Sequence, residues 1–394
     1  MENITCKGFK AAGIAAGIKK NGQRDLGLIF SETPAAVAGV FTRNRVQAAP
    51  VLLDRRRIAA GVCQALVVNS GNANCCTGPQ GMRDAEAAAA AVAAALDIAE
   101  ETVLVASTGV IGQPLPVDKI QSAAPDLTAA LRPDGIDQLA AAIMTTDTRP
   151  KVAAVHSTIA GRPFALVGTA KGAGMINPDM ATMLCFVCTD VDAPAGVLQQ
   201  CLHAAAAGSF NRITIDGDTS TNDTILLMAN GRSGVALDRP AHVSLFQSAL
   251  NEVLVRLAKA CVRDGEGVTK LVEVTVRGAS SDRDARRIAD TIANSPLVKT
   301  AFFGEDANWG RIFAAAGRAG AELDPQRLDL FFNDVQMADR GMGCGAEAEA
   351  DATRVLKLPE FAVTLDLNLG RGSASVLTCD FSVDYVRINA DYRS

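Results

Sequence analysis

Thr182 follows a small residue, Ala181, and opens an apolar run, TMLCFVCT over residues 182–189. A threonine that becomes the first residue of a chain carries a nucleophile, its hydroxyl, and a base, its α-amine with a pKa of about 7.7–8.0. The small Ala181 side chain lets the Thr182 hydroxyl approach the Ala181 carbonyl carbon. The pair therefore fits self-cleavage between Ala181 and Thr182 followed by acyl transfer. The alternative is common: a threonine that opens a strand is usually a packing residue.

Other catalytic and binding motifs are incomplete. The chain has three histidines, which leaves little material for a Ser-His-Asp triad. The glycine-rich run 169–174 lacks the G-K-[ST] ending of a phosphate-binding loop. The acidic loop 216–222 begins like a calcium loop, but Thr221 stands in the glycine position and Leu227 replaces the bidentate glutamate. We expect a solvated turn there.

The cysteines offer no convincing metal site. Cys185 and Cys188 have zinc or redox spacing, but residues three apart on a strand point to opposite faces. There is no second CxxC pair and no HxxxH pair. We therefore expect reduced, partly buried thiols, no metal and no cofactor.

The elements that must position these groups alternate between strands and helices. Apolar runs bounded by turn residues predict strands at 27–30, 36–41, 65–69 and 103–107, a hairpin from 152–158 and 164–170, and strands at 213–216 and 271–277. Helices are predicted at 82–96, 136–144, 196–208, 243–262 and 283–293. The small polar run 278–282 suggests a boundary between a main unit, 1–277, and a C-terminal unit, 278–394. This mixture predicts an α/β protein.

The charge and hydropathy of the chain exclude two classes of partner. The net charge is −5, which does not suit a non-specific nucleic-acid binder. The longest apolar run, Ala87–Leu96, is about half of the roughly 20 residues that a membrane-spanning helix needs. The first residues lack the basic start of a secretory signal, so we expect a cytoplasmic protein.

The stretch KGAGMINPDMATML, Lys171–Leu184, resembles the self-cleavage block of the ornithine acetyltransferase family, the bifunctional glutamate N-acetyltransferases. Further stretches resemble that family in the same order along nearly the whole chain. They are Gly39–Asn44, Ser107–Gly112, Ile143–Lys151, Asp216–Thr224, Asp264–Val274, Asn294–Ala301, Asn308–Ile312 and Tyr385–Ser394. Many motifs in the same order indicate the family far more specifically than any one of them alone.

The resemblance implies a set of active-site roles. Thr182 would be the nucleophile and the first residue of a second chain, 182–394, cut from a first chain, 1–181. The Thr108 hydroxyl and the Gly109 backbone N–H would form the oxyanion hole, where each donor is worth about 10²–10³ in rate. Without the resemblance, Thr108-Gly109 is better explained as a strand end with a tight turn.

The remaining implied residues bind substrate, and each has a structural alternative. Lys171 would hold a carboxylate, or be a solvated loop lysine. Thr145 would contact substrate, or cap a helix. Glu266 would pair with an amino group, or be a turn acid. Asn389 and Ser394, in the C-terminal tail, would reach the site only if the tail is docked.

The implied reaction moves an acetyl group from N2-acetyl-L-ornithine to L-glutamate through an acetyl-threonine. The implied fold is a layered α/β sandwich similar to the N-terminal-nucleophile hydrolases, with a smaller C-terminal α/β domain, and the implied assembly is an α2β2 heterotetramer. Whether acetyl-CoA is also a donor stays open. The alternatives are a related self-processing amidase or aminopeptidase, and an uncleaved small-molecule binding protein.

Overall fold

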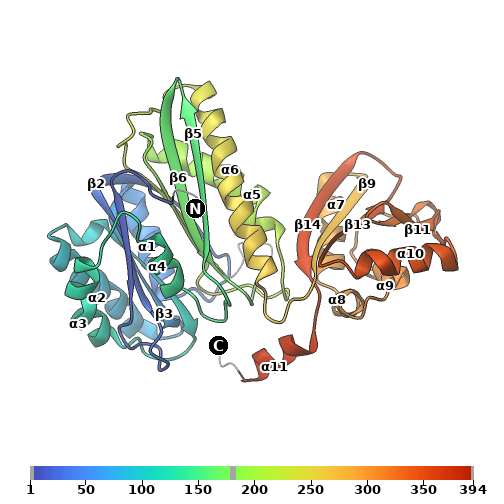
Figure 1. Cartoon of the computed structure of the whole chain (residues 1–394), viewed down its shortest axis with the longest axis horizontal. Helices are drawn as coiled ribbons and strands as arrows, with labels where there is room; N and C mark the ends of the chain where they lie inside the picture. The colour runs from blue at the N-terminus through green and yellow to red at the C-terminus, as the bar shows by residue number, and fades with distance from the viewer. Residues whose placement is uncertain (1–3, 178–182, 392–394) are drawn as a thin grey trace.

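The computed structural model describes residues 4–177 and 183–391 of the chain. Within these ranges the strands form one sheet of eight and one of six, so the α/β class expected from the sequence is confirmed. Figure 1 shows the two sheets in separate units. Three of the candidate residues, Ala181, Thr182 and Ser394, lie outside the described residues.

The first unit contains the eight-stranded sheet and six α-helices among the residues described. Its strands are β1 (Phe9–Ile14), β2 (Leu26–Phe41), β3 (Val62–Asn72), β4 (Val103–Val110), β5 (Lys151–Ile159), β6 (Arg162–Lys171), β7 (Leu184–Thr189) and β8 (Thr224–Ala229). Its helices are α1 (Ala49–Arg57), α2 (Gly78–Leu96), α3 (Val117–Ala129), α4 (Ile136–Ala142), α5 (Ala195–Gly208) and α6 (Pro240–Arg263).

The strand order is β4-β3-β2-β8-β7-β6-β5, with β1 also paired to β2. The long strand β2 joins two halves of this sheet. Residues 26–31 pair with β1, whereas residues 36–41 pair with β8. Its pairing with β3 shifts register between Phe30 and Ala35, and Pro34, which has no N–H to donate, lies in that interval. Two separate strands were expected at 27–30 and 36–41, and the structure instead has one bent strand.

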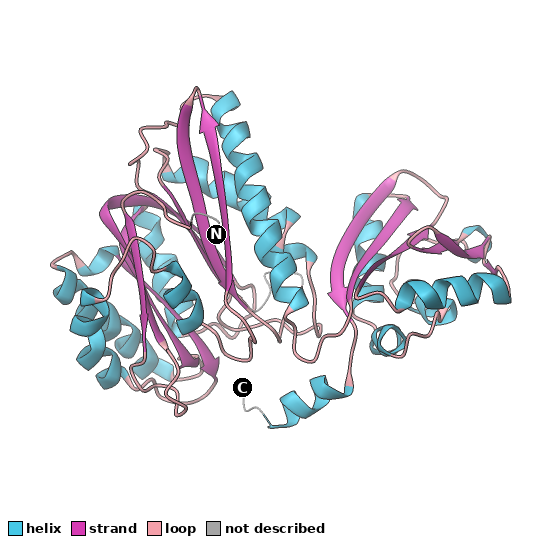
Figure 2. Cartoon of the chain, in the orientation of Figure 1, coloured by secondary structure: helices cyan, strands magenta, loops and turns pink. Residues whose placement is uncertain are grey.

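The two halves of the sheet pack face to face. One hydrophobic cluster combines Leu66 and Leu104 of β3 and β4 with Val167 and Phe186 of β6 and β7. Helices α2 and α3 pack on the outer face of the β3–β4 half, and α5 and α6 pack on the outer face of the other half (Figures 1 and 2). The resulting α–β–β–α layers agree with the sandwich that the family resemblance implied.

The alternation of β7 separates the two cysteines of the CxxC pair. Cys185 belongs to the cluster beneath α5 and α6, and Cys188 belongs to the cluster between the two half-sheets. Burial raises the pKa of both thiols. The two thiols lie on opposite faces of β7 and cannot bind the same metal ion, as the alternation of side chains along a strand predicted.

The second unit has the sheet order β12-β11-β10-β13-β9-β14. Its strands are β9 (Leu271–Ala279), β10 (Asp329–Phe332), β11 (Val335–Asp339), β12 (Met342–Gly343), β13 (Glu360–Asp366) and β14 (Gly372–Cys379). Its helices are α7 (Asp282–Ala293), α8 (Pro296–Phe303), α9 (Trp309–Gly317), α10 (Ala346–Leu356) and α11 (Val383–Asp391).

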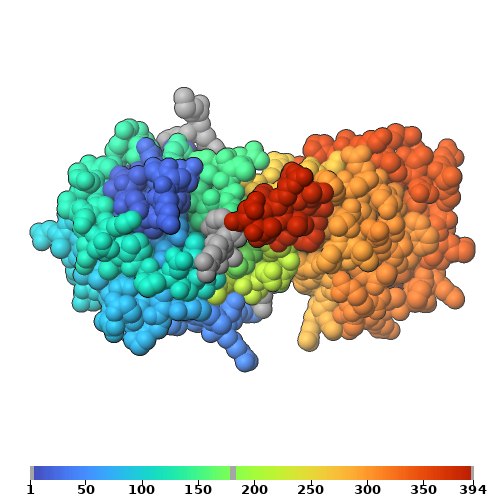
Figure 3. All heavy atoms as spheres, turned by 90° about the horizontal axis from the view of Figure 1, so that it is seen from below, coloured from blue at the N-terminus to red at the C-terminus, as the bar shows by residue number. Residues whose placement is uncertain are grey.

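Two details of the expected organisation change. The expected boundary after residue 277 falls inside β9, which is a central strand of the second sheet, so we place the division before Leu271. The strand predicted at 213–216 is wrong: Ile213 forms only an isolated bridge to Leu377 of β14. This bridge is a contact between the two units. The last helix, α11, leaves the second unit and lies across the face where the units meet, in dark red in Figure 3.

Candidate functional site

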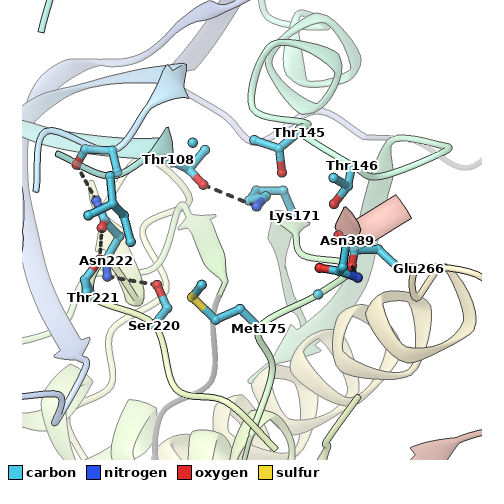
Figure 4. Close-up of a pocket in the computed structure, with 14 residues that line it drawn as sticks. Thr108, Thr145, Thr146, Lys171, Met175, Ser220, Thr221, Asn222, Glu266 and Asn389 are labelled. Carbon is cyan, nitrogen blue, oxygen red and sulfur yellow. Dashed lines mark hydrogen bonds between the residues drawn. The ribbon is translucent and has the colours of Figure 1, made fainter. Parts of the chain in front are cut away.

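Six of the predicted site residues line one pocket of about 590 Å³, a volume that includes its open part. These residues are Thr108, Gly109, Thr145, Lys171, Glu266 and Asn389. They come from the end of β4, the loop after α4, the end of β6, the loop after α6, and α11. Figure 4 labels all of them except Gly109 around a common space, with the Glu266 and Asn389 side chains on the side away from Thr108. The pocket thus combines residues that lie on both sides of the proposed cleavage point.

Thr108 and Gly109 lie near the end of the parallel pairing of β4 with β3, which runs to Val110. The register shifts at Gly71 and Asn72, opposite these residues, as a β-bulge does when it redirects a strand end. Gly109 has φ +130°, and a Cβ atom there would lie 2.4 Å from the Gly71 carbonyl carbon. Only glycine fits this close approach without moving the neighbouring strand.

Lys171 is 4% exposed and lies at the end of β6. Its Nζ donates a hydrogen bond of 3.2 Å to Thr108 Oγ1, across 63 residues of sequence (Figure 4). Among the residues described, no carboxylate lies within the 4.0 Å that defines an ion pair with this Nζ. Burial lowers the pKa of the Lys171 ammonium, and the Asp147 carboxylate opposes that shift. The pocket therefore contains a buried cation for which residues 4–177 and 183–391 provide no close counter-ion.

Asp147 ties together the two loops that present Thr145 and Lys171. Its carboxylate accepts hydrogen bonds from the Thr145 N–H at 3.0 Å and the Gly172 N–H at 2.7 Å. Lys151 also donates to it at 2.5 Å and to Asp264 at 2.6 Å. Burial would raise the pKa of Asp147, but the Lys171 and Lys151 ammonium groups outweigh it and lower that pKa to about 2. Asp147 is thus ionised and fixes one wall of the pocket.

Glu266 and Asn389 meet at the other end of the pocket. Asn389 Nδ2 donates to Glu266 Oε2 at 2.7 Å, so α11 is docked to the loop after α6. The Glu266 carboxylate lies so close to Gly174 that a Cβ on Gly174 would be 2.5 Å from Oε2. Gly174, inside the family-like stretch 171–184, therefore makes room for an acid that could receive an ammonium group.

The loop 216–223 supplies pocket residues to which the sequence assigned no role. Ser220, Thr221 and Asn222 line the pocket, and Asn222 Nδ2 donates to the Ser107 carbonyl at 2.8 Å, next to Thr108. Asp216 accepts hydrogen bonds from the Met175 and Ile176 N–H groups. The family-like stretch Asp216–Thr224 was the signal that could have identified them.

Met183, the residue after Thr182, is anchored beside this loop. Its N–H donates to Asp223 Oδ1 at 3.0 Å, and Asp223 is buried. Burial raises the pKa of Asp223 well above its ordinary range. The residue that follows the proposed nucleophile is therefore held in place just before the start of β7.

The arrangement suits acyl transfer. It brings the Thr108 hydroxyl, Gly109, a buried cation and a carboxylate to one pocket. Across residues 4–177 and 183–391, no group of three or more His, Cys, Asp or Glu side chains is placed to hold a metal ion. The described helices are all too short or too polar to cross a membrane.

Comparison with known proteins gives close relatives. The model of the ArgJ family matches residues 10–394. The arginine biosynthesis bifunctional protein ArgJ of Geobacter sulfurreducens is 55% identical over 393 residues, which cover 99% of this chain and 100% of the relative. The protein of that name from Syntrophotalea carbinolica is 52% identical, with the same coverage. A solved ArgJ structure from Bacillus halodurans is 42% identical, has a TM-score of 0.50, and covers 52% of this chain and 98% of that chain.

Proposed function

Because this chain belongs to the ArgJ family of arginine-biosynthesis enzymes, we propose that it transfers the acetyl group of N2-acetyl-L-ornithine to L-glutamate. The observation that carries the proposal is the pocket itself. Thr108 and Gly109, the buried cation of Lys171 and the carboxylate of Glu266 line one space, although they come from distant parts of the chain. A ligand with an acyl group, a carboxylate and an amine matches these three features.

The proposed reaction begins with cleavage of the Ala181–Thr182 bond. The Thr182 hydroxyl attacks the Ala181 carbonyl, and the peptide C–N bond breaks, which gives an ester and frees the Thr182 α-amine. Water then hydrolyses this ester, which leaves a carboxylate on Ala181 and restores the Thr182 hydroxyl. In each turnover the Thr182 Oγ then attacks the acetyl carbonyl, and its proton passes to the freed α-amine. Thr108 and Gly109 stabilise the oxyanion. The C–N bond breaks, and ornithine leaves with that proton. The glutamate amine then attacks the acetyl ester and gives up a proton to the α-amine. The bond to Thr182 Oγ breaks, Oγ takes that proton, and N-acetylglutamate leaves.

The remaining residues would hold the substrate. In this proposal Lys171 and Thr145 lie on the carboxylate side, and Glu266, supported by Asn389 and Ser394, receives the side-chain amine of ornithine. The 2.7 Å hydrogen bond between Asn389 and Glu266 supports a docked tail at this end. These groups hold the substrate beside the nucleophile, so the transfer avoids much of the entropic cost of bringing the reacting groups together.

The proposed mature protein has two chains, 1–181 and 182–394, that stay associated and form an α2β2 heterotetramer. Residues from both chains line the pocket, so neither would be active alone. A cytoplasmic location fits the cysteines, all of which are free thiols. Whether acetyl-CoA also acetylates Thr182 is tested directly by assaying the acetylation of glutamate with acetyl-CoA as the donor.

The first test is the intact mass of the denatured protein. We expect two chains that divide between Ala181 and Thr182, and a single uncut chain from the Thr182→Ala variant. Initial rates with both substrates varied should give parallel double-reciprocal lines, as a covalent intermediate requires. An uncut wild-type chain, or intersecting lines, would contradict the proposal. Release of acetate without glutamate would indicate an amidase instead.

A further inference from the structure

The hydrogen bond between Lys171 and Thr108 has only one possible direction. A lysine ammonium has three N–H donors and no acceptor, so Lys171 must donate and Thr108 Oγ1 must accept. The single hydroxyl hydrogen of Thr108 is then directed away from Lys171. Thr108 lines the pocket, and its side chain is almost fully buried. The lysine therefore restricts where this hydroxyl can donate.

The surroundings of Lys171 hold its ammonium against Thr108. Asp147 accepts a hydrogen bond from the backbone N–H of Gly172, the next residue, which fixes the end of β6. The bond to Thr108 is the one hydrogen bond that Nζ makes within residues 4–177 and 183–391. Hydrogen bonds from a charged donor are roughly twice as strong as neutral ones, and they are stronger still out of water.

We propose that Lys171 is a positioning residue for the oxyanion hole: it orients and polarises the Thr108 hydroxyl so that this hydroxyl donates to the oxyanion. This inference rests on the proposed function, because it needs an acyl-transfer step. It differs from the carboxylate-binding role, in which Lys171 contacts only the substrate. It also gives a function to a buried cation that has no ion-pair partner among the described residues.

Self-cleavage separates the two roles, because it involves no substrate carboxylate. If Lys171 acts through Thr108, its removal slows cleavage of the precursor as removal of the Thr108 hydroxyl does. If Lys171 only binds substrate, cleavage keeps its rate and only KM for acetylornithine rises. The precursor is made by cell-free synthesis, and the appearance of the chain 182–394 is followed by mass spectrometry.

The variants are Lys171→Met, Thr108→Val and their combination, with Lys20→Met as a control at an exposed lysine. Loss of one oxyanion donor costs about 10²–10³ in rate, so we expect Thr108→Val to lose that factor and Lys171→Met to lose about 10–100-fold. Because the two residues act as one unit, the double variant should be within about threefold of Thr108→Val. The same pattern should appear in kcat for acetyl transfer, and KM for acetylornithine should also rise in the Lys171 variants because the proposed function places Lys171 on the carboxylate side of the pocket.

A folding defect is separated from loss of the lysine by chemical rescue. The Lys171→Ala precursor should cleave faster as ethylamine is added, whereas tetramethylammonium, which carries charge but no N–H, should have no such effect. Wild-type cleavage rates in both Lys171 variants, with Thr108→Val still slow, would overturn this inference and leave the proposed function intact. A Thr108→Val precursor that cleaves at the wild-type rate would also overturn this inference, whereas the proposed function fails only if wild-type protein does not transfer acetyl groups from acetylornithine to glutamate.

Discussion

Replacement of Gly109 by alanine would place a methyl group against the adjoining strand. The added Cβ would lie 2.4 Å from the Gly71 carbonyl carbon and 2.5 Å from the Asn72 nitrogen. These are backbone atoms, which cannot rotate away as a flexible side chain can. The end of β4 and the bulge of β3 must therefore separate by about 1 Å to restore an ordinary van der Waals contact.

The cost has two parts. A non-glycine residue at φ +130° is strained by about 1–3 kcal/mol. Separation of the strand ends weakens two or three hydrogen bonds, each worth about 1 kcal/mol. The sum of about 3–6 kcal/mol is a large part of a typical stability of about 5–15 kcal/mol. A shift of about 1 Å in Thr108 and Gly109 should also reduce kcat about 100-fold.

Gly112, two residues beyond the end of β4, provides a matched control. It also has positive φ, +80°, but no heavy atom lies within 4 Å of its added Cβ. Gly112→Ala should therefore cost only about 1–2 kcal/mol from backbone strain. Thermal unfolding should place Gly109→Ala about 5–10 °C below Gly112→Ala, and self-cleavage and acetyl transfer should be slow only in Gly109→Ala. Equal stability and equal rates for the two variants would refute the geometry assigned to the end of β4.

Three further predictions concern the groups around the pocket. Asp147→Asn leaves the Lys151 and Lys171 ammonium groups with less compensation, so urea unfolding should show a loss of about 3–5 kcal/mol; an unchanged midpoint would contradict the Asp147 network. Burial raises the pKa of Asp216 in the folded protein to about 6, above an unfolded value of about 3.9. The contribution of Asp216 to stability is therefore fully present below the unfolded pKa and is lost as pH rises through the folded pKa. The stability of wild type relative to Asp216→Asn should thus fall by up to about 2 kcal/mol from pH 4.5 to 7, and a pH-independent difference would count against this. Asn389→Ala removes the contact of α11 with Glu266 and should raise KM for acetylornithine about tenfold with self-cleavage unchanged; slower cleavage would contradict this separation.

Local patterns predicted most of the elements. The hairpin expected from 152–158 and 164–170 is present as β5 and β6, because its alternation and its turn residues are both local. Strand β8, Thr224–Ala229, was not predicted, since a short, fully buried run has no alternation. The prediction of a strand at 213–216 is wrong because an apolar run beside a polar loop does not indicate which strand, if any, it can pair with.

The site could be predicted only in part. The family-like motifs identified Thr108, Lys171 and Glu266, but not which of them touch. The Lys171–Thr108 bond joins residues 63 apart, and the Asn389–Glu266 bond joins residues 123 apart. Such contacts depend on how the sheet closes and on where the last helix returns. Propensity and spacing contain neither kind of information.

The order of strands gives the proposed cut a kinetic consequence. Strands β7 and β8 follow the cut, yet in the sheet they lie between β2 and β6, which precede it. Each outer boundary is a six-residue ladder, β2 with β8 and β6 with β7. The second chain is therefore interleaved with the first, and cannot leave without breaking both ladders together. Before cleavage, refolding is a reaction of one molecule; afterwards it needs an encounter between two, so denaturation of the mature protein should become effectively one-way at low protein concentration.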